Sequence, residues 1–183
     1  MKKLMSQIIQ AARQMQIALD AQLLLGDIQR PTAAVHALLR GQAARDALAL
    51  ALRLAPRPYV VAWLCQCVRR QPLAADDSDG LRLAQAWVQR PDEANRRAAL
   101  AFAAGDDYRS VGAWLAAAAG WADGSLGEDD AAPPAAEHLT ATAGLAALLH
   151  LAARVPDTFE ATLAGWAEEI ARFLLPQGQE GAA

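Results

Sequence analysis

The chain has 183 residues, of which 54% are hydrophobic and 20% are charged, and its formal net charge at neutral pH is −3. One domain of this length can bury most of the surface that its unfolded form exposes, so no second domain is required. No apolar run approaches the roughly 18 residues of a membrane-spanning helix, so we expect no membrane partner and a cytoplasmic location.

The composition favours α-helix along almost the whole chain. Alanine makes up roughly a quarter of the residues, about three times its ordinary usage, whereas β-branched and aromatic residues are scarce. No alternating strand pattern lies beside a hairpin turn. We therefore predict an all-α fold: one irregular bundle of about eight helices over residues 1–175, with stacked helical hairpins as the alternative arrangement. Residues 176–183 are predicted to be a disordered tail.

Proline and glycine mark the predicted helix boundaries in the first half of the chain. Apolar side chains recur at the 3.6-residue period up to Leu23, and Gly26 follows them. Pro31 is placed to begin the next helix and Gly41 to end it. The predicted helices of this half span residues 4–25, 31–39, 42–54 and 58–70.

The second half begins with a predicted loop over residues 72–80, which is rich in Asp, Ser and Gly. Ser110 is placed to cap a helix that carries Trp114 and Trp121, and a spacing of seven residues puts both rings on one face. A loop follows over residues 122–137. The other predicted helices of this half span residues 81–89, 91–104, 138–154 and 157–175.

The two cysteines, Cys65 and Cys67, lie two residues apart within an apolar segment. On a helix this spacing points their side chains about 200° apart, so they neither share a metal nor close an ordinary disulfide. We interpret them as buried core thiols in reducing surroundings.

Charge is divided unevenly along the sequence. Residues 1–72 carry a net charge of +7 and residues 73–183 a net charge of −10. The division is compatible with a basic docking surface, with a self-complementary homodimer and with ordinary solvated charges. We expect no nucleic-acid partner, because no aromatic residues alternate with the basic ones. The candidate basic contacts of the N-terminal half are Arg13, Arg30 and Arg40.

Fingerprints of common catalytic and cofactor sites are missing from the sequence. Neither nucleotide-binding glycine motif occurs, and there is no CxxC pair or HExxH helix. No serine, cysteine or lysine stands in a recognisable nucleophile–base pattern. We therefore predict a protein that is not an enzyme, with no cofactor and no metal.

Two features suggest a binding site all the same. Arg96 and Arg97 lie in a helix of otherwise small and apolar residues, so one of them is expected to face a neighbour, where an acid such as Glu137 or Asp123 would meet it. The second feature is the cluster of aromatic and turn residues from Trp114 to Leu126. Either core packing under the loop or a pocket explains this cluster. Its candidate binding residues are Trp114, Trp121 and Ser125.

A pattern of residues along the middle of the chain resembles a known family. The residues that carry it are Trp87, Pro91, the Arg-Arg-Ala-Ala of 96–99, Gly120 with Trp121, the Gly-Ser-Leu of 124–126, Pro133 with Pro134, and the His-Leu-Thr-Ala of 138–141. Over about residues 58–154 the chain resembles an uncharacterised family of small all-helical bacterial proteins, loosely associated with type VI secretion gene clusters. The resemblance implies an accessory role, such as an adaptor or chaperone, and implies no catalytic residues.

The sequence thus favours a cytoplasmic, non-catalytic module that binds a protein partner, with the basic N-terminal half contributing electrostatically. The alternative is a helical domain that binds a small molecule or a lipid.

Overall fold

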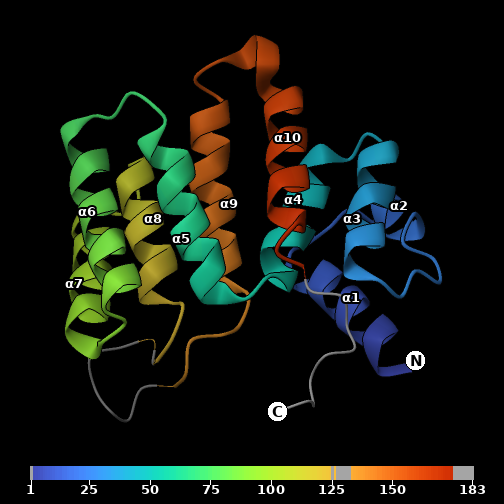
Figure 1. Cartoon of the computed structure of the whole chain (residues 1–183), viewed down its shortest axis with the longest axis horizontal. Helices are drawn as coiled ribbons and strands as arrows, with labels where there is room; N and C mark the ends of the chain where they lie inside the picture. The colour runs from blue at the N-terminus through green and yellow to red at the C-terminus, as the bar shows by residue number, and fades with distance from the viewer. Residues whose placement is uncertain (1, 125, 127–132, 175–183) are drawn as a thin grey trace. The chain divides into compact units, whose positions relative to one another are not determined.

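The computed structural model of the chain describes residues 2–124, 126 and 133–174 (Figure 1). The described residues form ten α-helices and one 3₁₀ turn, with no β-strand among them. The predicted all-α class is confirmed, with ten helices in place of about eight. The predicted tail over residues 176–183 lies outside the described residues.

The helices group into two compact units, and each is described by itself. Unit 1 takes in Met1–Pro56 and Asp157–Ala183, and unit 2 takes in Arg57–Pro156. Unit 1 is therefore built from both ends of the chain. The single domain over residues 1–175 stays a prediction.

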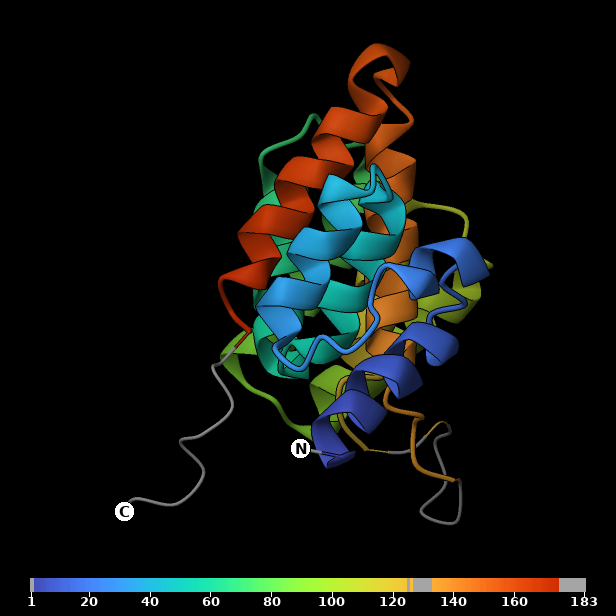
Figure 2. The same cartoon turned by 90° about the vertical axis from the view of Figure 1, so that its right-hand side faces the viewer.

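Unit 1 is organised around α4, the helix over Ala44–Leu54. Apart from Arg45, the side chains of α4 are buried from Ala44 to Leu52. Three helices pack on it, and α10 also packs on α3, as Figure 2 shows. The other helices of the unit are α1 (Lys2–Gln14), α2 (Leu19–Leu23), α3 (Pro31–Arg40) and α10 (Phe159–Ala171).

The predicted helix over residues 4–25 is wrong as one element, because the chain breaks between α1 and α2. Gln16 adopts a left-handed backbone with φ of 53°. Around it the N–H of Ile17 donates to Ala12 O at 3.0 Å and that of Gln16 to Arg13 O at 3.1 Å, the pattern that closes a helix C-terminus. The apolar period would place Leu19 and Leu23 on the buried face of one long helix. Because of the break, both side chains are instead 81% exposed.

α3 ends where it was predicted to end, but Gly41 is not the residue with the left-handed backbone there. Gly41 has an ordinary φ of −79°, and the left-handed residue is Gln42, with φ of 59°. A Cβ on Gly41 would stand 2.2 Å from the Cδ1 atom of Leu24. A larger residue at position 41 would have to displace the Leu24 side chain, which is 42% exposed, while a non-glycine residue adopts the strained conformation next to it.

In unit 2 the central helix is α8, which packs on each of the other four. Of its ten residues only Trp114 is not fully buried. Its run of alanines allows the neighbouring backbones to approach closely. The helices of this unit are α5 (Arg57–Arg69), α6 (Ala75–Gln89), α7 (Glu93–Gly105), α8 (Val111–Gly120) and α9 (Leu139–Ala152).

The closest approach in unit 2 is the contact between α6 and α8. A Cβ on Gly80 would stand 2.1 Å from Gly112 O, and a Cβ on Gly112 would stand 2.3 Å from Asp76 O. Asp77, which is 2% exposed, accepts a hydrogen bond from the Gly112 N–H at 3.1 Å and another from Arg154 at 2.8 Å. Asp77 therefore caps α8 from a different helix and ties both to the segment after α9.

This contact explains why the predicted loop over residues 72–80 is wrong. From Ala75 onward the segment is the first part of α6. Asp76 and Asp77 lie in the first turn, where carboxylates suit the helix dipole, and Gly80 lies inside the helix because the α8 backbone passes against it. The N-cap residue of α6 is Ala74, which makes no side-chain capping hydrogen bond.

The tryptophans of α5 and α6 are buried. Trp63 is 2% exposed and Trp87 is 3% exposed. Cys65 and Cys67 are buried, as predicted. Burial raises the pKa of the Cys65 thiol to about 12, so this sulfur is held in its neutral form.

The charge division along the sequence does not follow the units. Unit 1 contains eight basic and eight acidic residues, because the acidic α10 segment joins the basic N-terminal helices. Unit 2 contains nine basic and twelve acidic residues. The +7 and −10 halves are therefore a property of the sequence order, and neither unit is strongly charged.

Candidate functional site

The candidate site lies in unit 2, where α7, α8 and the chain after α8 meet. It begins with the first turn of α7. Asp92 caps this helix by accepting a hydrogen bond from the Asn95 N–H at 2.9 Å. Glu93 follows in the first turn, three and four residues before Arg96 and Arg97. Side chains at these spacings lie on one face, so a single carboxylate faces two guanidinium groups.

Glu93 binds both arginines. The Nε and Nη2 atoms of Arg96 donate to its two carboxylate oxygens, each at 2.6 Å, and Nε of Arg97 donates to Oε1 at 2.6 Å. The hydrogen bonds from Arg96 and then Arg97 lower the pKa of Glu93 to about 2. Glu93 is therefore ionised in the folded protein at any ordinary pH.

Arg96 is one of the largest fully buried side chains of the chain, at 2% exposure. Besides its bidentate contact with Glu93, its Nη1 atom donates to Gly120 O at 3.3 Å, at the end of α8. The hydrogen bond with Glu93 raises the pKa of Arg96 against the effect of burial, and the charge of Asp123 adds to the rise. Arg96 thus joins the first turn of α7 to the last turn of α8.

Gly124 covers the guanidinium group of Arg96. It has a φ of +75°, and a Cβ on it would stand 2.8 Å from Arg96 Nε. Both the backbone conformation and the contact favour glycine. Gly124 O accepts a hydrogen bond from the Ala135 N–H at 3.0 Å, and the Leu126 N–H donates to Pro133 O at 2.9 Å. These bonds hold the described ends of the loop together beside Arg96.

The turn between α7 and α8 holds two strained residues. Asp107 has a φ of 50° and Tyr108 a φ of 55°, in the left-handed region that bulky side chains rarely occupy. The Tyr108 N–H donates to Ala103 O at 3.1 Å and the Asp107 N–H donates to Ala104 O at 3.1 Å, which closes α7. Backbone strain of this kind occurs often at binding sites, where the surrounding structure holds it in place.

The strained turn directs the Tyr108 ring onto two tryptophans. The centroids of the Tyr108 and Trp121 rings are 5.9 Å apart with an angle of 19° between the ring planes, a stacked pair. The Trp114 ring lies 5.3 Å from Tyr108 and is tilted by 42°. Trp114 of α8 and Trp121, which follows the last residue of α8, therefore both face the Tyr108 ring, in line with their predicted common face.

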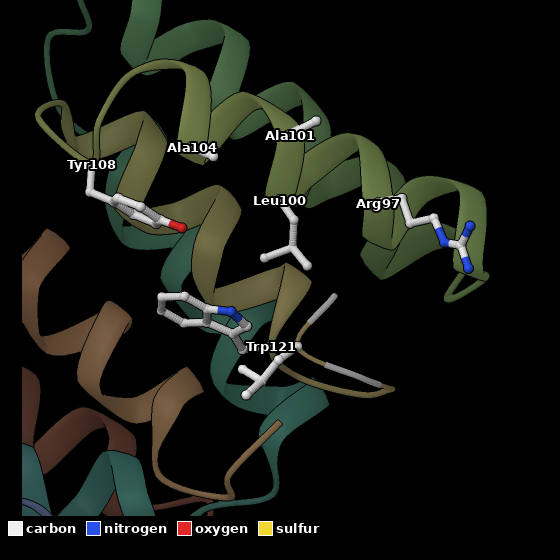
Figure 3. Close-up of a pocket in the computed structure, with 7 residues that line it drawn as sticks. Arg97, Leu100, Ala101, Ala104, Tyr108 and Trp121 are labelled. Atoms are coloured by element: carbon white, nitrogen blue, oxygen red, sulfur yellow. The ribbon is translucent and has the colours of Figure 1, made fainter. Parts of the chain in front are cut away.

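Beside this aromatic group lies a surface pocket with a volume of about 300 Å³. In Figure 3 the Tyr108 and Trp121 rings lie on the same side as the Leu100 side chain, and Arg97 lies at the opposite end from Tyr108. Leu126 is 43% exposed. The lining residues are Arg97, Leu100, Ala101, Ala104, Tyr108, Trp121 and Leu126, and we call them the aromatic pocket.

Residues 34–172, which include the whole aromatic pocket, match a family of unknown function named DUF6931. The chain belongs to the DUF6931 family. The match extends beyond residues 58–154, to which the resemblance had been assigned, and takes in α3, α4 and α10 of unit 1. No curated protein and no solved structure matches the chain. The DUF6931 match confirms an uncharacterised family and adds no link to secretion or to bacteria.

In this DUF6931 chain, some of the residues predicted from the sequence come together at the pocket. Arg97 and Trp121 line it, Arg96 is buried next to Arg97 in the sequence of α7, and Trp114 contacts the Tyr108 ring. The acid bound to Arg96 is Glu93, one turn earlier on the same helix. Arg96 had been expected to meet Glu137 or Asp123, and of these Asp123 adds its charge.

The remaining predicted site residues lie elsewhere. Ser125 lies outside the described residues. Arg13, Arg30 and Arg40 are exposed and belong to unit 1, whereas the aromatic pocket belongs to unit 2.

Two important residues were missed in the sequence, although one of them left a signal. Glu93 stands three residues before Arg96, and that spacing on a predicted helix is enough to indicate an ion pair. Tyr108 left no comparable signal, because its position depends on a left-handed turn that favours glycine or asparagine in sequence.

Two further observations limit the chemistry of the described residues. Nowhere in residues 2–124, 126 and 133–174 do three or more His, Cys, Asp or Glu side chains gather as metal ligands would. Among the same residues, no helix has the length and apolarity needed to cross a membrane.

Proposed function

We propose that this protein is a non-catalytic protein-interaction module and that the aromatic pocket is its docking point. The observation that carries the proposal is the stacked Tyr108–Trp121 pair, half-exposed at the edge of an open pocket. Its proposed role is that of an adaptor or chaperone accessory to a bacterial secretion system.

The residue types of the pocket support protein binding. Tryptophan, tyrosine and arginine supply most of the binding energy at protein interfaces, and one of each lines this pocket. Leu126, Ala101 and Ala104 are exposed around them. Such a patch binds an apolar side chain of a partner by removing both surfaces from water.

The polar groups of the pocket suit binding better than catalysis. They are one guanidinium, one phenol and one indole among the lining residues. Neither a nucleophile paired with a base nor a pair of carboxyl groups lies among these seven side chains, and proton transfer or covalent catalysis would require such groups.

The alternative function, binding of a small molecule or lipid, rests on the pocket volume. About 300 Å³ lies at the lower limit of ligand pockets in proteins. A ligand of that kind would remain partly exposed here, whereas a partner protein would cover the exposed Leu126 as well as fill the pocket.

The link to secretion rests on the resemblance carried by residues between Trp87 and Ala141. It implies that the partner is a cargo or a component of a secretion machine. Arg13, Arg30 and Arg40 are proposed to contribute electrostatically to the encounter, since all three are exposed.

The test compares two variants that each add one glutamate at an exposed helical alanine. Ala101→Glu places a charge in the aromatic pocket, and Ala161→Glu places the same charge on α10 in unit 1. Both full-length proteins and the wild type are used as bait in the lysate of the source organism, and retained proteins are identified by mass spectrometry. Native mass spectrometry of the protein purified from that organism detects a bound small molecule.

We expect one stoichiometric protein partner that the wild type and Ala161→Glu retain and that Ala101→Glu loses. A partner retained equally by all three proteins would contradict docking at the pocket. A bound small molecule whose occupancy falls in Ala101→Glu would favour the alternative function.

A further inference from the structure

We propose that the partner segment presents a large apolar side chain beside a carboxylate, and that Arg97 binds this carboxylate at the rim of the aromatic pocket. This inference rests on the proposed function and identifies the chemistry of the partner. It makes Arg97 the residue that determines specificity, while the Tyr108–Trp121 pair supplies the apolar contact.

The first step concerns the apolar side chain. The pocket wall is formed by the Leu100 side chain, two alanines and the two stacked rings, and its volume is about 300 Å³. This space accommodates one large aliphatic or aromatic side chain. Its aromatic walls offer faces and edges for ring contacts with a partner.

The second step concerns the charge at the rim. Arg97 is the charged residue among the seven that line the pocket. Its Nε atom donates to Glu93 Oε1 at 2.6 Å, so the bond to Glu93 uses one of its five N–H groups. Its side chain is 41% exposed, which leaves the Nη groups accessible to a planar carboxylate.

The third step is that Arg97 is held in place before a partner arrives. Its anchor, Glu93, is itself fixed by two hydrogen bonds of 2.6 Å from the buried Arg96. A side chain fixed in this way loses less conformational freedom on binding than a free arginine does. Arg109 on the adjoining turn has a side chain that is 74% exposed, and its Nε atom donates to Asp106 O at 3.1 Å.

The fourth step is the charge balance of this group. Glu93 shares its one negative charge between the guanidinium groups of Arg96 and Arg97, and the charge of Asp123 also acts on Arg96. A partner carboxylate at Arg97 adds an acid to a guanidinium group that otherwise shares Glu93 with Arg96. A partner lysine or arginine there would meet the exposed positive charge, which disfavours basic segments.

The experiment is a selection with a random-peptide display library on the full-length protein. Peptides are selected for binding to the wild type and against binding to Ala101→Glu, so that only pocket-dependent peptides survive. Dissociation constants of a selected peptide and of its acid-to-amide counterpart are then measured for the wild type, Arg97→Gln and Arg82→Gln. Arg82 is the matched control, since its side chain on α6 is 69% exposed and is not part of the pocket.

We expect the selected peptides to share a large apolar residue with Asp or Glu close to it. Arg97→Gln should weaken binding about fivefold, removing the peptide acid should weaken it by a similar factor, and the two changes together should weaken it little further. Arg82→Gln should leave the affinity unchanged. Circular dichroism verifies that each variant is folded.

Two results separate the inference from the proposed function. If pocket-dependent peptides carry no shared acid, or if loss of the acid is independent of Arg97, the inference about the carboxylate is overturned and the docking pocket remains. If no peptide distinguishes the wild type from Ala101→Glu, both the inference and the pocket as a peptide-docking point are contradicted.

Discussion

At the scale of single residues, the site depends on an arginine that is almost fully buried. Arg96 is 2% exposed, and its carboxylate partner Glu93 keeps 48% of its side chain exposed. The ion pair therefore joins the interior of unit 2 to its surface, with Arg96 linked to Gly120 and Gly124 on one side and Glu93 linked to Arg97 on the other. Loss of the acid would leave a buried guanidinium with a weaker partner.

This ion pair leads to a prediction about pH. The pKa of Glu93 is about 2 in the folded protein, against an ordinary value of 4.5 for glutamate. Because the folded-state pKa is the lower one, the unfolded chain binds more protons between these values. The contribution of Glu93 to stability is then complete above about pH 4.5 and is lost as the pH falls toward 2.

Glu93→Gln should therefore lower the free energy of unfolding at neutral pH, and its difference from the wild type should shrink as the pH falls. Urea unfolding followed by circular dichroism at a series of pH values measures this difference.

The pKa of Asp77 is also lowered, because hydrogen bonds from Arg154 and Gly112 outweigh the effect of its burial, but Asp77 is present in both proteins. Glu168→Gln, on the exposed face of α10, controls for the loss of one charge. A difference that stays constant with pH would contradict the prediction.

At the scale of helices, the sequence indicates which segments are helical but not always where they stop. Pro31, Ser110 and the alanine-rich runs were enough to place helices, because local propensity and capping act over a few residues. The break after α1 was not visible, since it depends on Gln16 in a conformation that glutamine rarely adopts. The start of α6 was not visible either, because it depends on the distant Gly112 backbone.

Part of the aromatic pocket was predictable as well, because local spacing along a helix places some of its residues. The spacing of seven residues between Trp114 and Trp121 was enough to place both rings on one side, and the arginines of α7 were conspicuous among apolar neighbours. The Tyr108 ring and the loop glycine over Arg96 come from turns, whose geometry is set by contacts between elements. Sequence periodicity carries no information about such contacts.

The contact between α6 and α8 gives a prediction at this scale. Gly112→Ala would put a Cβ 2.3 Å from a backbone oxygen of α6, so the two helices would have to separate. We expect this change to lower the free energy of unfolding by about 2–3 kcal/mol.

The control is Gly105→Ala at the end of α7, where a Cβ would meet nothing within 4 Å. Relieved of the entropy cost of glycine, that variant should be more stable than the wild type by up to about 1 kcal/mol. Equal effects of the two alanines in urea unfolding would show that α6 and α8 tolerate a wider separation.

At the scale of the whole molecule, the order in which the chain passes through the two units affects folding more than the division of charge along the sequence does. The basic N-terminal segment and the acidic α10 segment belong to the same unit, so the division of charge seen in the sequence largely cancels within unit 1. The same path means that unit 1 is completed only when the chain returns from unit 2. The packing of α10 on α3 and α4 closes a loop that contains all of Arg57–Pro156.

This topology predicts that the two units unfold together. If unit 2 were unfolded, α10 would be held to α4 across a flexible loop of roughly 100 residues, whose closure costs about 4 kcal/mol by the logarithmic rule. That cost is a large part of the roughly 5–15 kcal/mol that stabilises an ordinary domain. We therefore expect one cooperative transition, in agreement with the predicted single domain.

Two variants test this coupling, one that stabilises unit 1 and one that destabilises unit 2. Gln42→Gly relieves a left-handed residue in unit 1, where φ is 59°, and should stabilise that unit by about 1 kcal/mol, whereas Gly112→Ala destabilises unit 2. Four of the five tryptophans belong to unit 2, so tryptophan fluorescence reports mainly on unit 2 and circular dichroism on both units. If the units are coupled, each variant moves the urea midpoint by the same amount with both probes. If Gln42→Gly moves part of the dichroism transition and leaves the fluorescence transition in place, the units unfold separately, and the prediction of one domain over residues 1–175 is wrong.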